Sequence, residues 1–250
     1  MRLVASLICR NERTRFLDPC INSLLEFVDA VVILDDASDD GTKEWLHRLD
    51  DERIAAYSSS EPIFYKHEGR ARQRLIDITL SHAPTWVLSL DSDEFIDDGH
   101  ALRRRLEQDP EQPVWQLSIE EIWTANQHLY VREDGGWRTH GVPFLWKARP
   151  GVTWTMRDRK LACGRIPQQV MAHGARAKPS GVSLLHFGWT DPATRRARYD
   201  RYTKHDGGKF HASSHLRSIM WPESRIKLRR RSWPEGAVFD GLRERFTVAV

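Results

Sequence analysis

An α/β fold, with a mostly parallel central sheet flanked by helices, is what this 250-residue sequence predicts. Three apolar runs have the length of strands, and segments with helical spacing separate them; these runs are 3–9, 30–34 and 86–90. Continuous apolar runs of this length are typical of strands that are buried on both faces of a parallel sheet. The second and third runs end in clusters of carboxylates, so polar loops are expected at one edge of the sheet.

The elements of the first half follow in order. After the strand 3–9, apolar residues at helical spacing predict a helix over 17–28, and the strand 30–34 completes a β-α-β unit. This unit must cross over with a right hand, which brings the carboxyl ends of its strands to the same edge. The remaining elements predicted in this half are a short helix at 42–49, a strand at 54–57, a helix at 69–81 and the strand 86–90.

The second half has a different pattern. A helix is expected from Gly99 to about Glu107, and alternating apolar residues from Val114 onward indicate strands of a mixed sheet. Further strands are expected at 143–148, 152–155 and 182–187. From Asp191 the chain becomes rich in arginine and aromatic residues, which we interpret as a basic, mainly helical C-terminal extension. The predicted domains are thus 1–190, with a half at 1–98 and a half at 99–190, and the extension 191–250.

Composition limits the classes of protein that remain. The net charge of +3 comes from nearly balanced counts, 38 basic and 35 acidic residues, which is not the balance of a dedicated nucleic-acid binder. Three cysteines without Cys-x-x-Cys spacing argue against a disulfide framework and against a zinc site, and they fit a reducing cytoplasm. Apolar runs are too short for a signal peptide or a membrane span, so the expectation is a cytoplasmic protein.

The central chemical feature is Asp91-Ser92-Asp93-Glu94, which directly follows the strand 86–90. On an extended backbone residues two apart point to the same face, so Asp91 and Asp93 can converge on one object. Two carboxylates in one place repel unless a positive charge lies between them. A hard divalent cation, Mg²⁺ or Mn²⁺, meets that need and usually comes with a substrate diphosphate. An acidic turn after a buried strand is the structural alternative.

Three motifs together resemble those of family 2 type glycosyltransferases of the GT-A fold. They are Asn11-Glu12 after the first strand, residues 35–42 (Asp-Asp-Ala-Ser-Asp-Asp-Gly-Thr) after the second, and Asp91-Ser92-Asp93-Glu94. Their order and spacing match as well as their residue types, over residues 3–98. The resemblance implies a Rossmann-like GT-A domain that transfers a sugar from a nucleotide donor, most often a UDP-sugar, to an acceptor hydroxyl with inversion.

The resemblance also implies roles for particular residues. Asn11, Glu12 and Asp36 would belong to the donor nucleotide site, with Asp36 accepting a hydrogen bond from a uracil-like base. Asp91 would lie near the ribose and the metal, and Asp93 would bind Mn²⁺ or Mg²⁺ directly. Two arginines on the helix before the metal strand, Arg70 and Arg72, would face the phosphates or else belong to a solvated helical face.

Two assignments fall in the second half. His186, in the sequence His-Phe-Gly-Trp at the end of an apolar segment, resembles the C-terminal metal-binding histidine of several GT-A enzymes, although a structural histidine is an equal alternative. An inverting transfer also needs a carboxylate base near the acceptor hydroxyl. Asp158, Glu120 and Glu121 are the three candidates, and Asp158 is favoured from its place in the sequence.

The acceptor is less specified than the donor. Arginines interleaved with aromatic residues after Asp191 suit an anionic acceptor, such as a lipopolysaccharide core, a polyprenyl phosphate at the membrane surface, or DNA with hydroxymethylated bases. The alternatives are helices with solvated arginine faces, or a catalytically inactive GT-A-like module that docks on nucleic acid or a partner through this segment. A nucleotidyltransferase is disfavoured because no glycine-rich phosphate loop with a lysine follows the first strand.

Overall fold

A computed structural model describes residues 1–154, 163–174, 176–206 and 211–248. Its contacts divide the chain into two compact units, one formed by residues 1–117 and 142–182 and the other by 118–141 and 183–250. We call them unit 1 and unit 2. Among the described residues, no helix combines the length and the apolar character needed to cross a bilayer.

Unit 1 contains a sheet with strand order β8-β4-β1-β2-β3, in which β4, β1, β2 and β3 are parallel and β8 is antiparallel. These strands span Leu3–Cys9 (β1), Ala30–Asp35 (β2), Ile54–Ser58 (β3), Trp86–Asp91 (β4) and His140–Lys147 (β8). The parallel sheet and its strand positions confirm the α/β prediction. Because β4 and β2 both neighbour β1, the loops that follow these strands lie at one edge.

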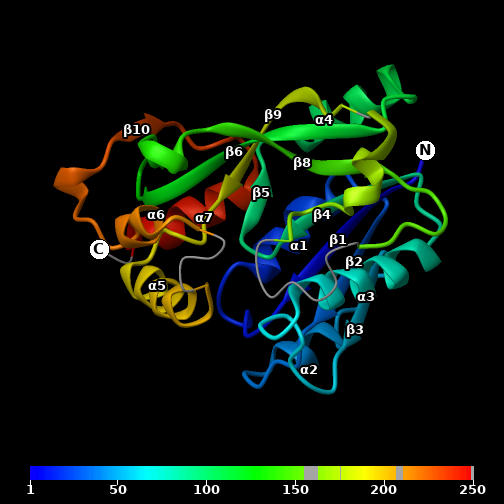
Figure 1. Ribbon diagram of the computed structural model, residues 1–250, viewed down its shortest axis with the longest axis horizontal. Coiled ribbons are helices and arrows are strands. Elements are labelled where there is room, and N and C mark those ends of the chain that lie inside the picture. The colour runs from blue at the N-terminus through cyan, green and yellow to red at the C-terminus, as the bar shows by residue number, and fades with distance from the viewer. Residues whose placement is uncertain (155–162, 175, 207–210, 249–250) are drawn as a thin grey trace. The chain divides into compact units, whose positions relative to one another are not determined.

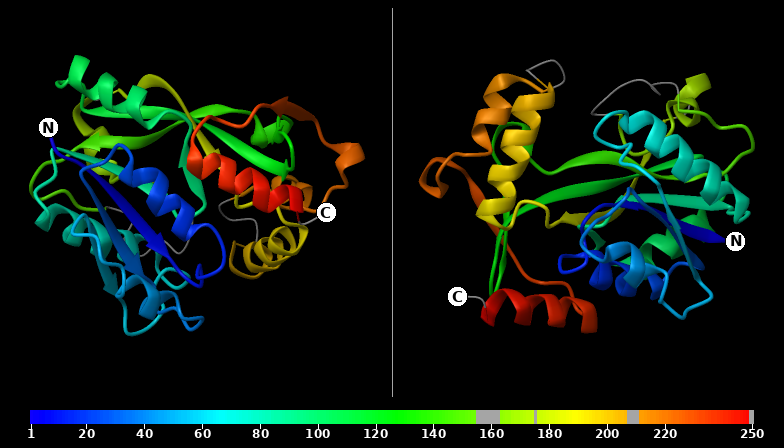
Figure 2. Two further views of the ribbon diagram at one scale, coloured as in Figure 1. Left: turned by 180° about the vertical axis from the view of Figure 1, so that it is seen from behind. Right: turned by 90° about the horizontal axis from the view of Figure 1, so that it is seen from below.

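Helices cover both faces of this sheet. Helix α3 (Glu68–Ser81) packs against β1 and β2, and its Ala71 and Leu75 join Val4 and Val32 in one apolar core. Helix α1 (Leu17–Leu25) packs against β2 and β5 (Glu94–Ile96). Figure 1 shows α3 in front of the strands, and the reverse view in Figure 2 shows α1 in front of them. The remaining helices of unit 1 are α2 (Thr42–Leu46), α4 (Gly99–Gln108) and the 3-10 segment Gln168–Gly174.

One predicted strand is not formed. Val152 and Trp154 belong to a buried apolar cluster with Trp146, which explains their apolar character, but residues 152–154 lie outside any strand, and residue 155 is outside the described range. Their backbone N–H groups bond to side chains instead of to a neighbouring strand: that of Thr153 donates to Gln169 Oε1 at 2.9 Å, and that of Trp154 to Gln73 Oε1 at 2.5 Å. Burial alone therefore misled the prediction.

Unit 2 is built on an antiparallel sheet of order β10-β7-β6. Its core includes Trp123, Trp137 and Trp189, which pack on Leu216 and Ile219. In Figure 2, helix α5 (Pro192–Asp206) lies beside α6 (Ser213–Ser218), as their contacts also show. The other elements are β6 (Val114–Ala125), β7 (Leu129–Arg132), β9 (Lys178–His186), β10 (Leu228–Arg231), α7 (Ala237–Val248) and two short 3-10 segments, Gly135–Trp137 and Glu223–Arg225.

This grouping differs from the expected boundary at residue 190. Residues 118–141 group with 183–250 because β10 from the C-terminal segment pairs with β7, with Leu228 opposite Arg132 and Arg231 opposite Leu129. The basic segment therefore supplies a strand to the sheet of unit 2 in addition to its helices. Strands β6, β8 and β9 each begin in one unit and end in the other.

Candidate functional site

The loops that follow β1 and β2 are tied together by the polar residues of the two motifs. The Asn11 side chain donates to Asp39 Oδ1 at 2.8 Å, and the Asp39 backbone N–H donates back to Asn11 Oδ1 at 3.0 Å. The Asn11 backbone N–H donates to Ser38 Oγ, whose hydroxyl in turn contacts Asp35. Asn11 has a positive φ of 56°, a conformation that asparagine tolerates better than most residues. The motif residues thus hold the loops after β1 and β2 to each other at this edge of the sheet.

Asp36 and Glu12 are both buried in the same region. Asp36 is 1% exposed, and its carboxylate accepts hydrogen bonds from the backbone N–H groups of Ile63 at 2.8 Å and Phe64 at 3.0 Å. Glu12 accepts a hydrogen bond from Arg15 at 2.8 Å, and its backbone N–H donates to Thr42 Oγ1. Asp36 therefore holds the loop before α3 in place, whatever else it binds.

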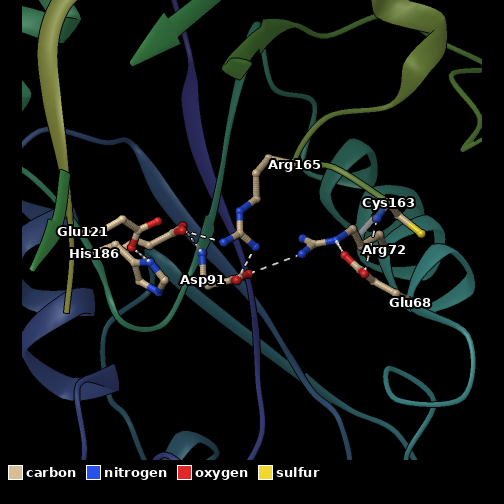
Figure 3. A network of polar contacts seen from close by, with 8 residues as sticks. Glu68, Arg72, Asp91, Glu121, Cys163, Arg165 and His186 are labelled. Atoms are coloured by element: carbon tan, nitrogen blue, oxygen red, sulfur yellow. Dashed lines mark hydrogen bonds and ion pairs between the residues drawn. The ribbon is translucent and has the colours of Figure 1, made fainter. Parts of the chain in front are cut away.

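The carboxylates after β4 lie in a cluster with two arginines (Figure 3). Arg165, from the stretch after Cys163, contacts Asp91 with one guanidinium nitrogen and donates to Glu94 Oε1 at 2.6 Å with another. Arg72, from α3, approaches Asp91 Oδ1 at 3.6 Å. The other oxygen of Glu94 accepts the Asp91 backbone N–H at 2.7 Å, so Glu94 closes the turn that carries Asp91 and Asp93.

Neighbouring charges determine the protonation states of Asp91 and Arg165. Burial by itself raises the pKa of Asp91, but the positive charges of Arg165 and Arg72 outweigh it and leave the pKa below its usual value. For Arg165, burial opposes the charge while Asp91 and Glu94 favour it, and the pKa of the guanidinium is raised. Asp91 is therefore a carboxylate and Arg165 a cation at neutral pH.

The two arginines of α3 differ in their surroundings. Arg72 is 4% exposed; its Nε donates to Glu68 Oε1 at 2.7 Å, and its guanidinium lies over the rings of Phe64 and Trp154. Arg70 is exposed. Of the two arginines, Arg72 is the one that the described contacts place beside Asp91.

Unit 2 holds a second polar pair. His186, at the end of β9, contacts Glu121 of β6 through Nδ1 at 2.6 Å, and both side chains are largely buried (Figure 3). Burial raises the pKa of Glu121, yet His186 and Arg198 together with a hydrogen bond from Trp189 bring it below its usual value. Glu121 is consequently the partner that fixes the His186 ring, which is the usual arrangement around a metal-binding histidine.

The other two base candidates have different positions. Glu120, next to Glu121 on β6, is 6% exposed and accepts a hydrogen bond from Ser183 Oγ at 3.1 Å. Arg229 and Arg231 of β10 lie 3.4 Å and 3.3 Å from its Oε2. Glu120 thus serves as the charge partner of the basic strand. Asp158 lies outside the described residues.

Several cations of the basic segment are used within unit 2. Arg195 donates to the carbonyl oxygens of Trp123 and Trp189 and lies over the Trp123 ring, 4.7 Å from its centroid. Arg198 stacks over Trp189 in the same way, and Arg229 also pairs with Glu133. These contacts agree with a structural use of the segment, while exposed basic residues remain at 196, 204, 225, 227 and 230.

Residues 6–120 match the family described as "Glycosyl transferase family 2". Over these residues the chain resembles family 2 glycosyltransferases, and its α/β architecture matches that of the GT-A fold. Among solved structures, the mannosyltransferase PcManGT from Pyrobaculum calidifontis in complex with GDP-Man and Mn²⁺ has a TM-score of 0.52 and 16% identity, and the alignment covers 82% of this chain and 61% of that one. This likeness concerns the fold.

Two curated proteins similar to this chain are the uncharacterized proteins Mb3815c of Mycobacterium bovis and Rv3786c of Mycobacterium tuberculosis. Each is 25% identical over 217 residues, which are 82% of this chain. The chain spans about half the length of these relatives, since the alignment covers 51% of each.

The acidic turn that follows β4 fits a hard divalent ion that binds together with a substrate. Among the described residues no group of three histidine, cysteine or acidic side chains is arranged to hold a metal by itself. Mg²⁺-type ions, however, commonly take one or two carboxylates from the protein and complete their shell with phosphate oxygens and water. Asp91 and Asp93 supply that number, and the charge of Asp93 acts on Asp91 in the same turn.

Sequence reasoning missed the part that three charged residues of unit 1, Glu68, Glu94 and Arg165, have in the cluster with Asp91. Arg165 lies 74 residues from Asp91 in a stretch without periodicity, so no local pattern pointed to it. Glu68 had no motif around it, and Glu94 was seen only as the last letter of the acidic motif. The sequence contained a weak indication that Arg72 is buried, because Ala71 and Leu75 of the apolar stripe lie near it on the same helix.

Proposed function

We propose that this protein transfers a sugar from a nucleoside diphosphate donor to an acceptor hydroxyl, with a divalent metal bound at Asp91 and Asp93. The observation that carries this proposal is the cluster at the end of β4, where a half-buried and a buried carboxylate for a metal, Asp91 and Asp93, and guanidinium groups for phosphates occur together. The match of residues 6–120 to the glycosyltransferase family supports it independently.

Each residue of unit 1 has a definable part in this proposal. Asp91 and Asp93 hold the metal, which when bound neutralises the charge that develops on the leaving nucleotide. Arg72, fixed by Glu68 at 2.7 Å, places a positive charge beside the same carboxylates and toward the diphosphate. Asp36 and the loop it holds at Ile63 and Phe64 contact the base. These groups bind and orient the donor before any bond is broken.

For unit 2 we propose that His186 is a metal ligand and that Glu121 orients it. With Nδ1 in contact with Glu121 at 2.6 Å, a metal would be bound through Nε2. This assigns Glu121 a positioning role instead of the role of base. Asp158 stays the predicted base of an inverting reaction, and the anomeric configuration of the product, measured by NMR, tests the inversion.

Donor binding is the first test. We expect a nucleoside diphosphate, UDP first and GDP as the alternative that the GDP-Man complex of PcManGT suggests, to raise the melting temperature only when Mn²⁺ or Mg²⁺ is present. At a hundredfold excess over Kd the gain is about 2.7 kcal/mol, which for this chain length corresponds to roughly 5–11 °C. Asp93→Asn removes the gain. Asp109→Asn, which changes an exposed carboxylate of unit 1 paired with Lys178, retains it.

The result decides the proposal. A stabilisation by nucleotide alone, unaffected by metal and by Asp93→Asn, would contradict the metal assignment. Absence of any effect from UDP, GDP, CMP and dTDP with both metals would contradict the donor site as a whole and leave the inactive binding module as the better hypothesis.

An anionic acceptor is the part of the proposal that the basic segment supports. Exposed basic residues on α5 and β10, among them Arg196 and Arg230, leave positive charge on the surface of unit 2. Acceptor affinity should then fall steeply as salt is raised, for a phosphorylated glycan, a lipid-linked phosphate or DNA alike. A flat salt response would point to a neutral saccharide acceptor.

A further inference from the structure

Arg165 contacts Asp91, one of the two carboxylates proposed to hold the metal. Its guanidinium contacts Asp91 on one side and donates to Glu94 Oε1 at 2.6 Å on the other, so a single cation bridges two carboxylates of the acidic turn. The Arg165 side chain is 18% exposed and that of Glu94 is fully buried, so the contact lies under the surface of unit 1. No sequence motif indicates this contact of Arg165.

The formal charges of the described residues favour a divalent ion in this cluster. Glu68, Asp91 and Glu94 contact the guanidinium groups of Arg72 and Arg165, and the charge of Asp93 acts on Asp91. For these six residues the formal excess is two negative charges, which is the charge that one Mn²⁺ or Mg²⁺ would compensate. The excess is held in a partly buried place, where charges are screened less than at the surface.

The guanidinium fork itself fits either of two partners. Its paired N–H groups match two carboxylate oxygens, as here with Asp91 and Glu94, and match the oxygens of a diphosphate equally well. A metal that binds Asp91 takes away one partner of Arg165 and, in the proposed donor complex, brings a diphosphate to the same place. The cation can then exchange a carboxylate partner for a phosphate partner without leaving its pocket.

We propose that Arg165 is a donor-binding residue that holds Asp91 while the site is without donor and turns to the diphosphate when metal and nucleotide bind. This inference rests on the proposed function. It predicts competition: Arg165 weakens the binding of metal alone, and it strengthens the binding of the nucleoside diphosphate with metal. A purely structural arginine would also weaken metal binding, but it would not strengthen the binding of the diphosphate.

The first experiment titrates the whole protein with Mn²⁺ in the absence of nucleotide and follows the free ion by electron paramagnetic resonance. Arg165→Gln removes the competing positive charge and should bind Mn²⁺ at least about tenfold more tightly than the unchanged protein. Arg165→Lys keeps the charge and should stay close to the original affinity. Arg103→Gln is the matched control, because Arg103 is a unit 1 arginine that pairs with Asp29 at 3.1 Å on another element.

The second experiment measures nucleotide affinity at saturating Mn²⁺ by calorimetry. For UDP, or GDP if the protein selects guanine, Arg165→Gln should lose at least about tenfold in affinity, because a charge-assisted contact to phosphate is gone. For the corresponding nucleoside monophosphate the loss should stay within about twofold, since the contact proposed is to the diphosphate. Arg165→Lys should bind the diphosphate with intermediate affinity, as it retains charge without the fork.

The outcomes separate this inference from the proposed function. If the unchanged protein binds a nucleoside diphosphate with Mn²⁺ and Arg165→Gln matches it in both titrations, the inference is wrong and the proposed function stands. If Arg165→Gln loses metal, monophosphate and diphosphate binding together and melts at a lower temperature, Arg165 is a structural tie and the inference is again wrong. If the unchanged protein binds no nucleotide with metal, the proposed function itself fails.

Discussion

Replacement of Asp36 by asparagine distinguishes a structural role of this residue from a role in base recognition. The carboxylate is 1% exposed and accepts two backbone N–H groups, from Ile63 at 2.8 Å and Phe64 at 3.0 Å. Asparagine has the same shape but only one acceptor oxygen, and its amide N–H₂ would face one of the two backbone donors. The loop that leads into α3 would therefore lose one of its two attachments to Asp36.

The magnitude follows from these contacts. A hydrogen bond to a charged group contributes about 1.5–3 kcal/mol, and a buried donor left without an acceptor costs a further 1–3 kcal/mol or so. Because the remaining bond also changes from charged to neutral, we expect Asp36→Asn to destabilise the native state by about 3 kcal/mol. For a chain of this length that lowers the melting temperature by roughly 6–12 °C.

The assay is hydrogen exchange at the two amides combined with a urea titration. The N–H groups of Ile63 and Phe64 should exchange markedly faster in Asp36→Asn, while amides in the strand β1 keep their protection until global unfolding. Asp39→Asn is the control, since Asp39 is exposed and its described hydrogen bonds are both with the Asn11 side chain. Its effect should stay within about 0.5 kcal/mol.

An unchanged exchange rate at residues 63 and 64 would refute the structural reasoning. If nucleotide affinity were nevertheless lost, Asp36 would act through the base alone, as the family resemblance implies. If both exchange and affinity change, the loop before α3 is the element through which Asp36 affects the donor.

Three further predictions concern packing and charge. Gly99→Ala should destabilise unit 1 by about 1–3 kcal/mol in urea unfolding, because a β-carbon there would lie 2.0 Å from Phe27 Cδ1. Adding Phe27→Leu should restore part of this stability, and equal urea midpoints for Gly99→Ala and the unchanged protein would contradict the close approach. Arg132→Met should lower the free energy of unfolding by roughly 3 kcal/mol, because the buried guanidinium lies between tryptophan rings and donates to Asp134 at 2.9 Å and to the Ser218 carbonyl at 2.8 Å. An unchanged stability would show that this ion pair contributes nothing. Burial, His211 and Arg132 lower the pKa of His215 from its ordinary value of 6.5, so the unfolded chain binds the proton first and stability should be lost as pH falls below 6.5. His215→Phe, which keeps the stack on Trp137, should reduce this dependence of unfolding free energy on pH in unfolding titrations.

Much of unit 1 could be predicted from the sequence because its strands are buried on both faces. Runs such as Leu3–Cys9 and Ala30–Asp35 are mostly apolar and are buried at every position, so their location needs no knowledge of partners. The acidic loops follow these strands directly, and parallel pairing brings the loops to one edge. The local sequence was therefore sufficient to predict these strands and the acidic loops at their carboxyl ends.

Unit 2 could not be predicted in the same way, because its order depends on pairings between distant segments. Strand β10 has the sequence Leu-Arg-Arg-Arg, which has no strand pattern of its own. It becomes a strand because β7 offers it a partner and because Glu120 and Glu133 accept its arginines. Charge pairing replaces apolar burial here, and a sequence pattern based on burial does not detect it.

The polar pairs of the candidate site show why a residue's role is harder to predict than its presence. Glu121 and His186 were both selected from the sequence, one as a base and one as a metal ligand, and 65 residues separate them. Their contact changes the interpretation of both, since a carboxylate committed to Nδ1 orients the ring and is not available to an acceptor hydroxyl. Asp91 makes the same point through Arg165, 74 residues away. In each case the chemistry of a conspicuous residue is set by a partner that the local sequence does not indicate, so replacing the partner, Glu121 or Arg165, is the more informative experiment.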